Sequence, residues 1–93
     1  MPIVTVKFFA TVREITGIGK IEMEADDIKG LLIQLTKKYG KSFEDAVIEP
    51  DTQELKRFFS CMINGKRIEL LDGYDTRLKD GDAVALFPPV GGG

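Results

Sequence analysis

Apolar and polar residues alternate in four stretches of the chain, and this alternation is typical of half-buried strands. In the first stretch, Val4, Val6 and Phe8 fall on one face and the residues between them on the other. The four stretches cover residues 3–9, 20–25, 58–63 and 83–87. Asn64-Gly65 is a strong hairpin signal, so a short fifth strand is expected over residues 66–70.

One stretch has helical periodicity instead. Its apolar residues recur at helical spacing, and they are Ile28, Leu31, Leu32, Leu35 and Tyr39. Asp26-Asp27 can cap the N-terminus, and Gly40 can adopt the left-handed cap at the other end. The pattern predicts a helix over about residues 28–39, followed by an irregular segment over 42–56. A single helical turn is expected before Gly17.

These elements predict an α+β domain with a mixed sheet of four to five strands and one main helix packed on one face. The domain is expected to cover residues 1–87. Pro88-Pro89 must end the last strand, since proline cannot donate to a ladder, and residues 88–93 should form a flexible C-terminal tail.

Composition restricts the classes of function. The net charge of −2 gives no reason to expect nucleic acid as a partner, and no apolar run is long enough to span a membrane. The chain has no histidine, which removes the commonest general base and the commonest zinc ligand. With Cys61 as the single cysteine and no signal peptide apparent, we expect a cytoplasmic protein.

The acidic pairs of the sequence are interpreted as structural. They stand beside turns or a helix start, where aspartate is favoured for capping: Asp26-Asp27, Asp72/Asp75 and Asp80/Asp82. Cys61 alternates inward with Ile63 and is expected to be a small buried hydrophobe, not a nucleophile. No metal site is predicted, and nothing internal has the pattern of a catalytic centre.

Large apolar side chains on the outward face of the sheet are the first external feature. If Val4, Val6 and Phe8 face the helix, alternation places four others on the opposite face: Phe9, Phe58, Met62 and Phe87. Exposed aromatic residues of this kind predict a protein interface. The alternative is that segment 42–56 covers some of them.

The C-terminal sequence Phe-Pro-Pro-Val-Gly-Gly-Gly is the second external feature. Pro88-Pro89 should hold the exit extended, and the last six residues reach about 20 Å from the domain. Gly91, Gly92 and Gly93 have no side chains, so they suit a narrow channel in a partner. The one reactive group at this end is then the α-carboxylate of Gly93. The alternative is an end without function.

Three segments carry a resemblance to a known family. They are "VKFFATVREITG" from Val6, "INGK" from Ile63 and "LKDGDAVALFPPVGGG" from Leu78. The chain resembles the small, sulfur-carrying subunit of molybdopterin synthase, which is a ubiquitin-like β-grasp protein. The resemblance covers most of the chain, and the last segment is its most specific part.

The resemblance implies a mechanism in which other proteins hold the catalytic groups. A ubiquitin-activating-type enzyme uses ATP to adenylate Gly93, and sulfur replaces AMP to give a thiocarboxylate. The tail then enters the large synthase subunit and donates sulfur to a pyranopterin precursor of the molybdenum or tungsten cofactor. The working synthase would be a heterotetramer, and the carrier itself would bind no cofactor.

The resemblance implies roles for individual residues of this chain. Gly92 and Gly93 match the terminal diglycine, and Gly91 adds a third glycine without a new role. Phe9 and Phe87 match aromatic positions of the partner-binding surface. Met62 is added from alternation, and Pro88 from its place at the exit. Two alternatives stay open: a ubiquitin-like modifier joined to lysines through its C-terminal glycine, and a sulfur carrier for thiamine or cysteine synthesis.

Overall fold

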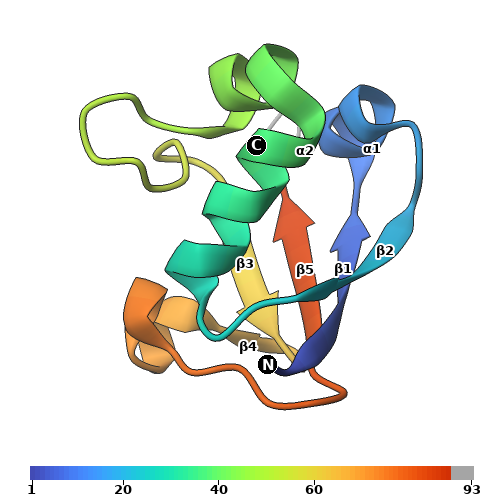
Figure 1. Cartoon of the computed structure of the whole chain (residues 1–93). Helices are drawn as coiled ribbons and strands as arrows, with labels where there is room; N and C mark the ends of the chain where they lie inside the picture. Colours follow the sequence, from blue (N-terminus) through green and yellow to red (C-terminus); the bar gives the residue numbers. More distant parts are fainter. Residues whose placement is uncertain (89–93) are drawn as a thin grey trace.

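A five-stranded mixed sheet forms one layer of the molecule (Figure 1). The computed structural model describes residues 1–88. The strands are β1 (Ile3–Phe8), β2 (Lys20–Glu24), β3 (Ser60–Ile63), β4 (Lys66–Arg67) and β5 (Ala83–Phe87). Their order in the sheet is β2-β1-β5-β3-β4. The central pair β1 and β5 is parallel and the other pairs are antiparallel, so β1 and β5 end at the same edge.

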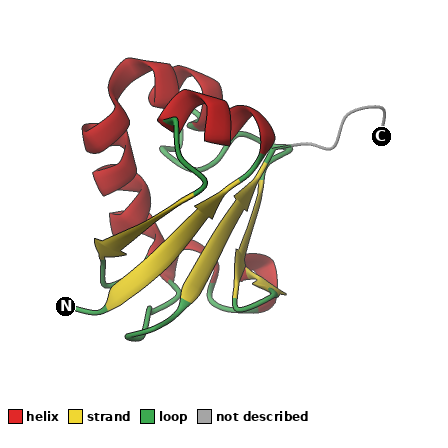
Figure 2. Cartoon of the chain, turned by 90° about the vertical axis from the view of Figure 1, so that its right-hand side faces the viewer, coloured by secondary structure: helices red, strands yellow, loops and turns green. Residues whose placement is uncertain are grey.

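The helices lie on one side of this sheet, as the turned view shows (Figure 2). α2 (Ile28–Val47) crosses the sheet, and α1 (Ala10–Thr16) packs beside it. Two short 3-10 turns, Ile68–Leu70 and Gly73–Asp75, follow β4. The predicted α+β fold, with one main helix on one face of a mixed sheet, is therefore confirmed, as is the helical turn that ends at Gly17.

The core lies between the sheet and α2. Each inward-facing strand residue predicted from alternation is buried, and these are Val4, Val6, Phe8, Cys61, Ile63, Val84 and Leu86. They meet the apolar stripe of α2, in which Ile28, Leu31 and Leu35 have no exposed surface. Removing water from both faces provides the main stabilisation of the domain.

The main helix is longer than predicted. Gly40 has φ 74° and ψ −152°, so it breaks the helical path as expected, but the chain resumes a helix in a new direction and continues to Val47. The reason is burial: Phe43 and Val47, four residues apart, are both completely buried. The expectation that segment 42–56 is irregular was therefore wrong for its first six residues.

Two strand boundaries also differ from the prediction. Phe58 lies before β3, not inside it, and β4 contains only Lys66–Arg67. After Arg67 the chain leaves the ladder and forms a 3-10 turn over Ile68–Leu70, in which Ile68 is 3% exposed and Leu70 is 77% exposed. Because Lys66 pairs with the buried Ile63, Ile68 would face inward in a continued strand as well, so its burial does not favour one path over the other.

Aspartates hold the turns that set the strands in place. Asp27 caps α2 by accepting a hydrogen bond from the Gly30 N–H at 2.7 Å. Asp80 accepts one from the Ile3 N–H at 2.8 Å, and Asp82 accepts one from the Lys79 N–H at 2.8 Å. The structural interpretation of these three residues is confirmed.

Candidate partner-binding surface

The sheet face opposite α2, here called the open face, contains the outward residues of β1, β5 and β3. Strand register places Lys7 opposite Ala85, and Ala85 opposite Met62, so these three side chains form one row across the sheet. A second row at the end of the sheet places Phe87 opposite Ser60. The open face thus has an apolar centre with a lysine at its side.

Phe9 and Phe87 form a stacked pair at the end of this face. Phe9 keeps an extended backbone, with φ −130° and ψ 149°, so it continues the alternation of β1 before α1 begins. Phe87 is the last residue of β5, which runs parallel to β1. The two ring centroids are 4.5 Å apart and the rings are inclined by 11°. The predicted outward orientation of both residues is confirmed.

The backbone next to this pair is strained. Ala10, which follows Phe9, has φ 52°, a left-handed conformation that disfavours an L-residue by about 1–2 kcal/mol. The strain lies where the chain turns from β1 into α1 and where the Phe9 ring is directed onto Phe87. Phe9 remains 38% exposed while Phe87 is half-buried, so the pair presents an apolar edge to solvent.

Met62 extends the apolar surface beside Phe87. Met62 is half-buried and stands two residues from Ser60, the partner of Phe87, so it is a diagonal neighbour of the ring. Pro88 directly follows Phe87 and is also half-buried. The structure therefore brings together three of the residues predicted for partner binding, Phe9, Met62 and Phe87, and the fourth, Pro88, follows Phe87 in the chain.

The three glycines predicted to carry the chemistry, Gly91, Gly92 and Gly93, lie outside the described residues. The assignment of residues 88–93 as a separate tail also extends beyond them and stays a prediction. What the structure does place is the start of this segment, which leaves the sheet at Phe87, beside the ring of Phe9.

Phe58 was predicted to lie inside the third strand, but it stands in the turn before β3. It is 69% exposed, precedes β3, and has the Arg57 guanidinium 5.6 Å from its ring centroid. The alternative that segment 42–56 covers the outward aromatics does not hold for Phe9 or Phe58, because both are exposed. That segment instead packs Ile48 and Leu55, which pair in an isolated antiparallel bridge, against the core.

The interior of the domain has little reactive chemistry. Burial, with a smaller contribution from the charge of Glu69, raises the pKa of the Cys61 thiol to about 12, so it stays protonated and unreactive near neutral pH. Within residues 1–88, no three His, Cys, Asp or Glu side chains gather as they would around a metal ion. No helix in the same range is long and apolar enough to cross a membrane.

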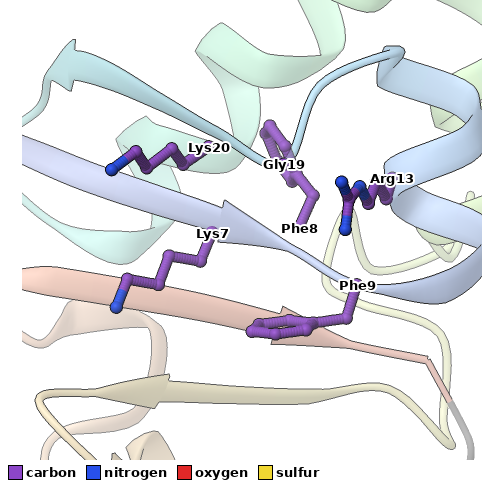
Figure 3. A pocket seen from close by; sticks show the side chains of 6 residues that line it. All are labelled: Lys7, Phe8, Phe9, Arg13, Gly19 and Lys20. Atoms are coloured by element: carbon purple, nitrogen blue, oxygen red, sulfur yellow. The ribbon is translucent and has the colours of Figure 1, made fainter.

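A group of cations beside Phe9 was not predicted from the sequence. Lys7, Arg13 and Lys20, here called the basic cluster, line an open hollow of about 440 Å³ together with Phe8, Phe9 and Gly19 (Figure 3). The signal was present in the two alternating stretches, since Lys7 and Lys20 both occupy outward positions. Only the register of β1 and β2 shows that they are opposite each other.

Comparison with known proteins identifies the family. A family model described as the ThiS family matches residues 6–93. The chain belongs to the ThiS family. The ubiquitin-like sulfur-carrier fold expected from the resemblance is thereby confirmed.

Two curated relatives of this ThiS-family chain cover nearly all of it. Small archaeal modifier protein 3 of Haloferax volcanii is 39% identical, with 94% of this chain and 95% of the relative aligned. The sulfur carrier protein CysO of Mycobacterium tuberculosis is 28% identical over 97% of this chain and 98% of its own. The family therefore includes proteins named for modification and proteins named for sulfur transport.

Solved structures show the same fold. The small archaeal modifier protein 1 of Methanosarcina acetivorans superposes with a TM-score of 0.88 and 33% identity, covering 100% of this chain and 98% of the other. A Pyrococcus furiosus protein assigned as molybdopterin converting factor, subunit 1, superposes with a TM-score of 0.75 and 26% identity, covering 97% of this chain and 100% of the other. The ThiS-family fold is thus shared by proteins assigned to different tasks.

Proposed function

We propose that this ThiS-family chain is a sulfur carrier in molybdenum or tungsten cofactor synthesis and that its reacting group is the α-carboxylate of Gly93. The observation that supports this proposal is the stacked pair of Phe9 and Phe87. Exposed aromatic side chains are typical anchors for a protein partner. A partner that binds this pair also fixes the point from which the last residues extend, about 20 Å at full length.

The proposed chemistry proceeds in two stages on Gly93. A carboxylate is a poor electrophile, so one of its oxygens first attacks the α-phosphorus of ATP and pyrophosphate leaves. A sulfide equivalent then attacks the acyl carbon, a C–S bond forms, and AMP leaves to give a thiocarboxylate. A ubiquitin-activating-type adenylating enzyme would hold ATP and the groups that catalyse both steps.

Sulfur transfer then occurs in the large subunit of the synthase. The thiocarboxylate sulfur would form a bond to a carbon of the pyranopterin precursor while a C–O bond at that carbon breaks and the oxygen leaves with the bonding electrons. Water would then hydrolyse the resulting thioester at the acyl C–S bond, which leaves the sulfur on the precursor and restores the Gly93 carboxylate. Segments without side chains suit such a buried site, which accounts for Gly91 and Gly92. The working assembly would be a heterotetramer of two large and two small subunits.

Mass spectrometry of the intact chain tests the carrier chemistry. The full chain is incubated with the adenylating enzyme, ATP and a sulfide source. The expected result is a mass gain equal to the replacement of one oxygen by one sulfur. A variant lacking Gly92 and Gly93 serves as the control and should gain nothing. An unchanged mass for the full chain would contradict every sulfur-carrier function.

A protein modifier is the second candidate, and the 39% identity to small archaeal modifier protein 3 favours it. The same adenylate would then be attacked by a lysine amine, giving an isopeptide bond to Gly93. Lys79 is the last basic residue of the sequence, so trypsin leaves residues 80–93 on the modified lysine. Adducts with this long remnant would support the modifier.

Reconstitution with the large synthase subunit distinguishes the two proposed acceptors, which are the pyranopterin precursor and a protein lysine. Formation of the dithiolene product from the thiocarboxylated chain and the pyranopterin precursor would support the cofactor role. The relative named as a sulfur carrier protein is consistent with sulfur transport in general and leaves other sulfur acceptors as further outcomes of this assay. Failure with the large subunit after successful thiocarboxylation would exclude the molybdenum or tungsten pathway alone.

A further inference from the structure

Lys7 and Lys20 are directly opposite each other in the β1–β2 ladder. Both side chains leave the sheet on the same side, and Arg13 extends from α1 toward Gly19, at the right of the hollow in Figure 3. Like charges at directly opposed positions destabilise a sheet. The fold itself therefore gains nothing from this pair of lysines.

The described residues contain no salt bridge to any member of the basic cluster. The two salt bridges found in residues 1–88 lie elsewhere, between Lys41 and Asp45 and between Arg67 and Glu69. Glu22 follows Lys20 on the outward side of β2, but it stands opposite Thr5, one row further along. Three cationic side chains, those of Lys7, Arg13 and Lys20, thus line one hollow in a chain whose net charge is −2.

The position of the basic cluster links it to the proposed interface. Phe9 lines the hollow together with Lys7 and Arg13. The Phe9 ring also stacks on the ring of Phe87. The same edge of the sheet is where β5 ends and the chain continues toward Gly93. A partner that binds the aromatic pair would therefore also meet the basic cluster.

We infer that the basic cluster binds an acidic segment of the adenylating enzyme, with Phe9 and Phe87 as the adjacent apolar contact. This inference rests on the proposed function, because it names the surface chemistry of the partner that activates Gly93. Complementary charge at the rim of an interface raises the association rate and makes it salt-dependent. An acidic segment also relieves the repulsion between Lys7 and Lys20.

A protein partner fits the observations better than nucleic acid does. The cluster contains only three cations and has Glu22 in the next row, whereas a nucleic-acid surface requires an extended basic stripe. The nearby aromatic rings also stack on each other, so they do not form separate platforms on which bases could stack. Acidic protein side chains need only a local patch of positive charge.

The experiment measures carrier-dependent adenylation by ATP–pyrophosphate exchange at increasing KCl concentrations. The variant Lys7→Gln/Lys20→Gln should raise the KM for the carrier about tenfold at low salt, leave kcat unchanged and reduce the salt dependence. Lys7→Glu/Lys20→Glu should raise KM further. Lys29→Gln/Lys37→Gln removes the same charge from exposed positions of α2 and is the matched control.

Thermal melts of the same proteins separate binding from folding. Because the two lysines repel each other, Lys7→Gln/Lys20→Gln should leave the melting temperature unchanged or raise it, while a lower value would mean that the pair is structural and would overturn the inference. Unchanged KM and salt dependence, or an equal effect of the α2 control, would also overturn it. The inference would also be overturned if the native chain bound a single-stranded RNA oligonucleotide and Lys7→Gln/Lys20→Gln abolished that binding.

The outcome for the native chain distinguishes this inference from the proposed function. If the native chain is not adenylated at all, the proposed function fails and the inference fails with it. If the native chain is adenylated normally and the Lys7→Gln/Lys20→Gln variant has the same KM, the inference alone fails.

Discussion

Asn64 and Asp82, 18 residues apart, join the β3–β4 hairpin to the turn before β5. The Asn64 Nδ2 group donates to the Asp82 Oδ1 atom at 2.9 Å, and the Ala83 N–H donates to the Asn64 Oδ1 atom at 2.9 Å. The Asn64 N–H also donates to the Ala83 carbonyl at 2.8 Å. This contact fixes β3 beside β5 and so determines where Phe87 leaves the sheet.

Replacement of Asn64 by alanine should destabilise the domain. Asn64 has φ 51°, which asparagine tolerates better than alanine, and the substitution also removes both side-chain hydrogen bonds. We expect the free energy of unfolding to fall by about 1–2 kcal/mol. The melting temperature should fall by about 4–8 °C for each kcal/mol in a domain of this size.

Asn64→Asp is the control for that experiment. Aspartate still accepts from the Ala83 N–H and tolerates the left-handed backbone, but it places a second carboxylate beside Asp82. Its stability should fall between the native chain and Asn64→Ala and should recover when acid protonates one of the two carboxylates. Equal stability of Asn64→Ala and the native chain in urea melts would contradict the role given to this contact.

The Cys61 thiol should react very slowly in the folded protein. It is 2% exposed, and burial followed by the charge of Glu69 raises its pKa to about 12, so little thiolate is present at pH 8. Ellman's reagent should label the denatured chain rapidly and the native chain only as fast as the domain opens. Rapid native labelling would contradict the burial of this residue.

The same pKa shift predicts a loss of stability at alkaline pH. Below pH 9.0, the ordinary value, the thiol is neutral in both folded and unfolded chains. As the pH rises from there toward about 12, the unfolded thiol ionises first, so the free energy of unfolding falls. Burial also raises the pKa of Tyr39 and Tyr74, which adds a loss of the same sign. Urea melts of the native chain and Cys61→Ala should differ less at high pH than at pH 7.

The fold was predictable because its signals are local. Alternation identified the inward residues of the strands, and Asp27 identified the start of α2. The part of α2 after Gly40 was missed because a glycine commonly ends a helix, whereas here burial of Phe43 favours a second helical segment. β4 is shorter than the hairpin signal predicted, because the chain enters a 3-10 turn at Ile68.

The candidate surface was only partly predictable from the sequence. Alternation placed Phe9 and Phe87 on one face, but their stacking depends on the parallel pairing of β1 and β5, which are far apart in sequence. The opposition of Lys7 and Lys20 depends in the same way on a register that the intervening loop and α1 determine. Non-local pairings of this kind are not encoded in the pattern of either strand alone.

Gly40 should be hard to replace. Its φ of 74° with ψ of −152° belongs to a region that only glycine adopts readily, so Gly40→Ala should destabilise the domain by about 1–3 kcal/mol although the added methyl group meets open space. Gly19→Ala is the matched control. Its added Cβ would lie 3.6 Å from the Arg13 guanidinium, an ordinary contact, and its backbone is not left-handed. Similar melting temperatures for the two variants would show that the bend at Gly40 is not strained.

The stacked rings of Phe9 and Phe87 should act as one unit in partner binding. Phe9→Ala and Phe87→Ala should each weaken binding to the adenylating enzyme by about 1–3 kcal/mol, because each removes a ring that a partner would cover. The double variant should lose less than the sum of the two, since the second truncation removes a ring whose neighbour is already gone. Calorimetric titration measures the affinities, and urea melts show whether a variant has also lost stability. Phe58→Ala is the control, because it removes an exposed ring that lies outside the sheet. Strict additivity would mean that partners bind the rings independently, and unchanged affinity in both single variants would exclude the pair from the interface.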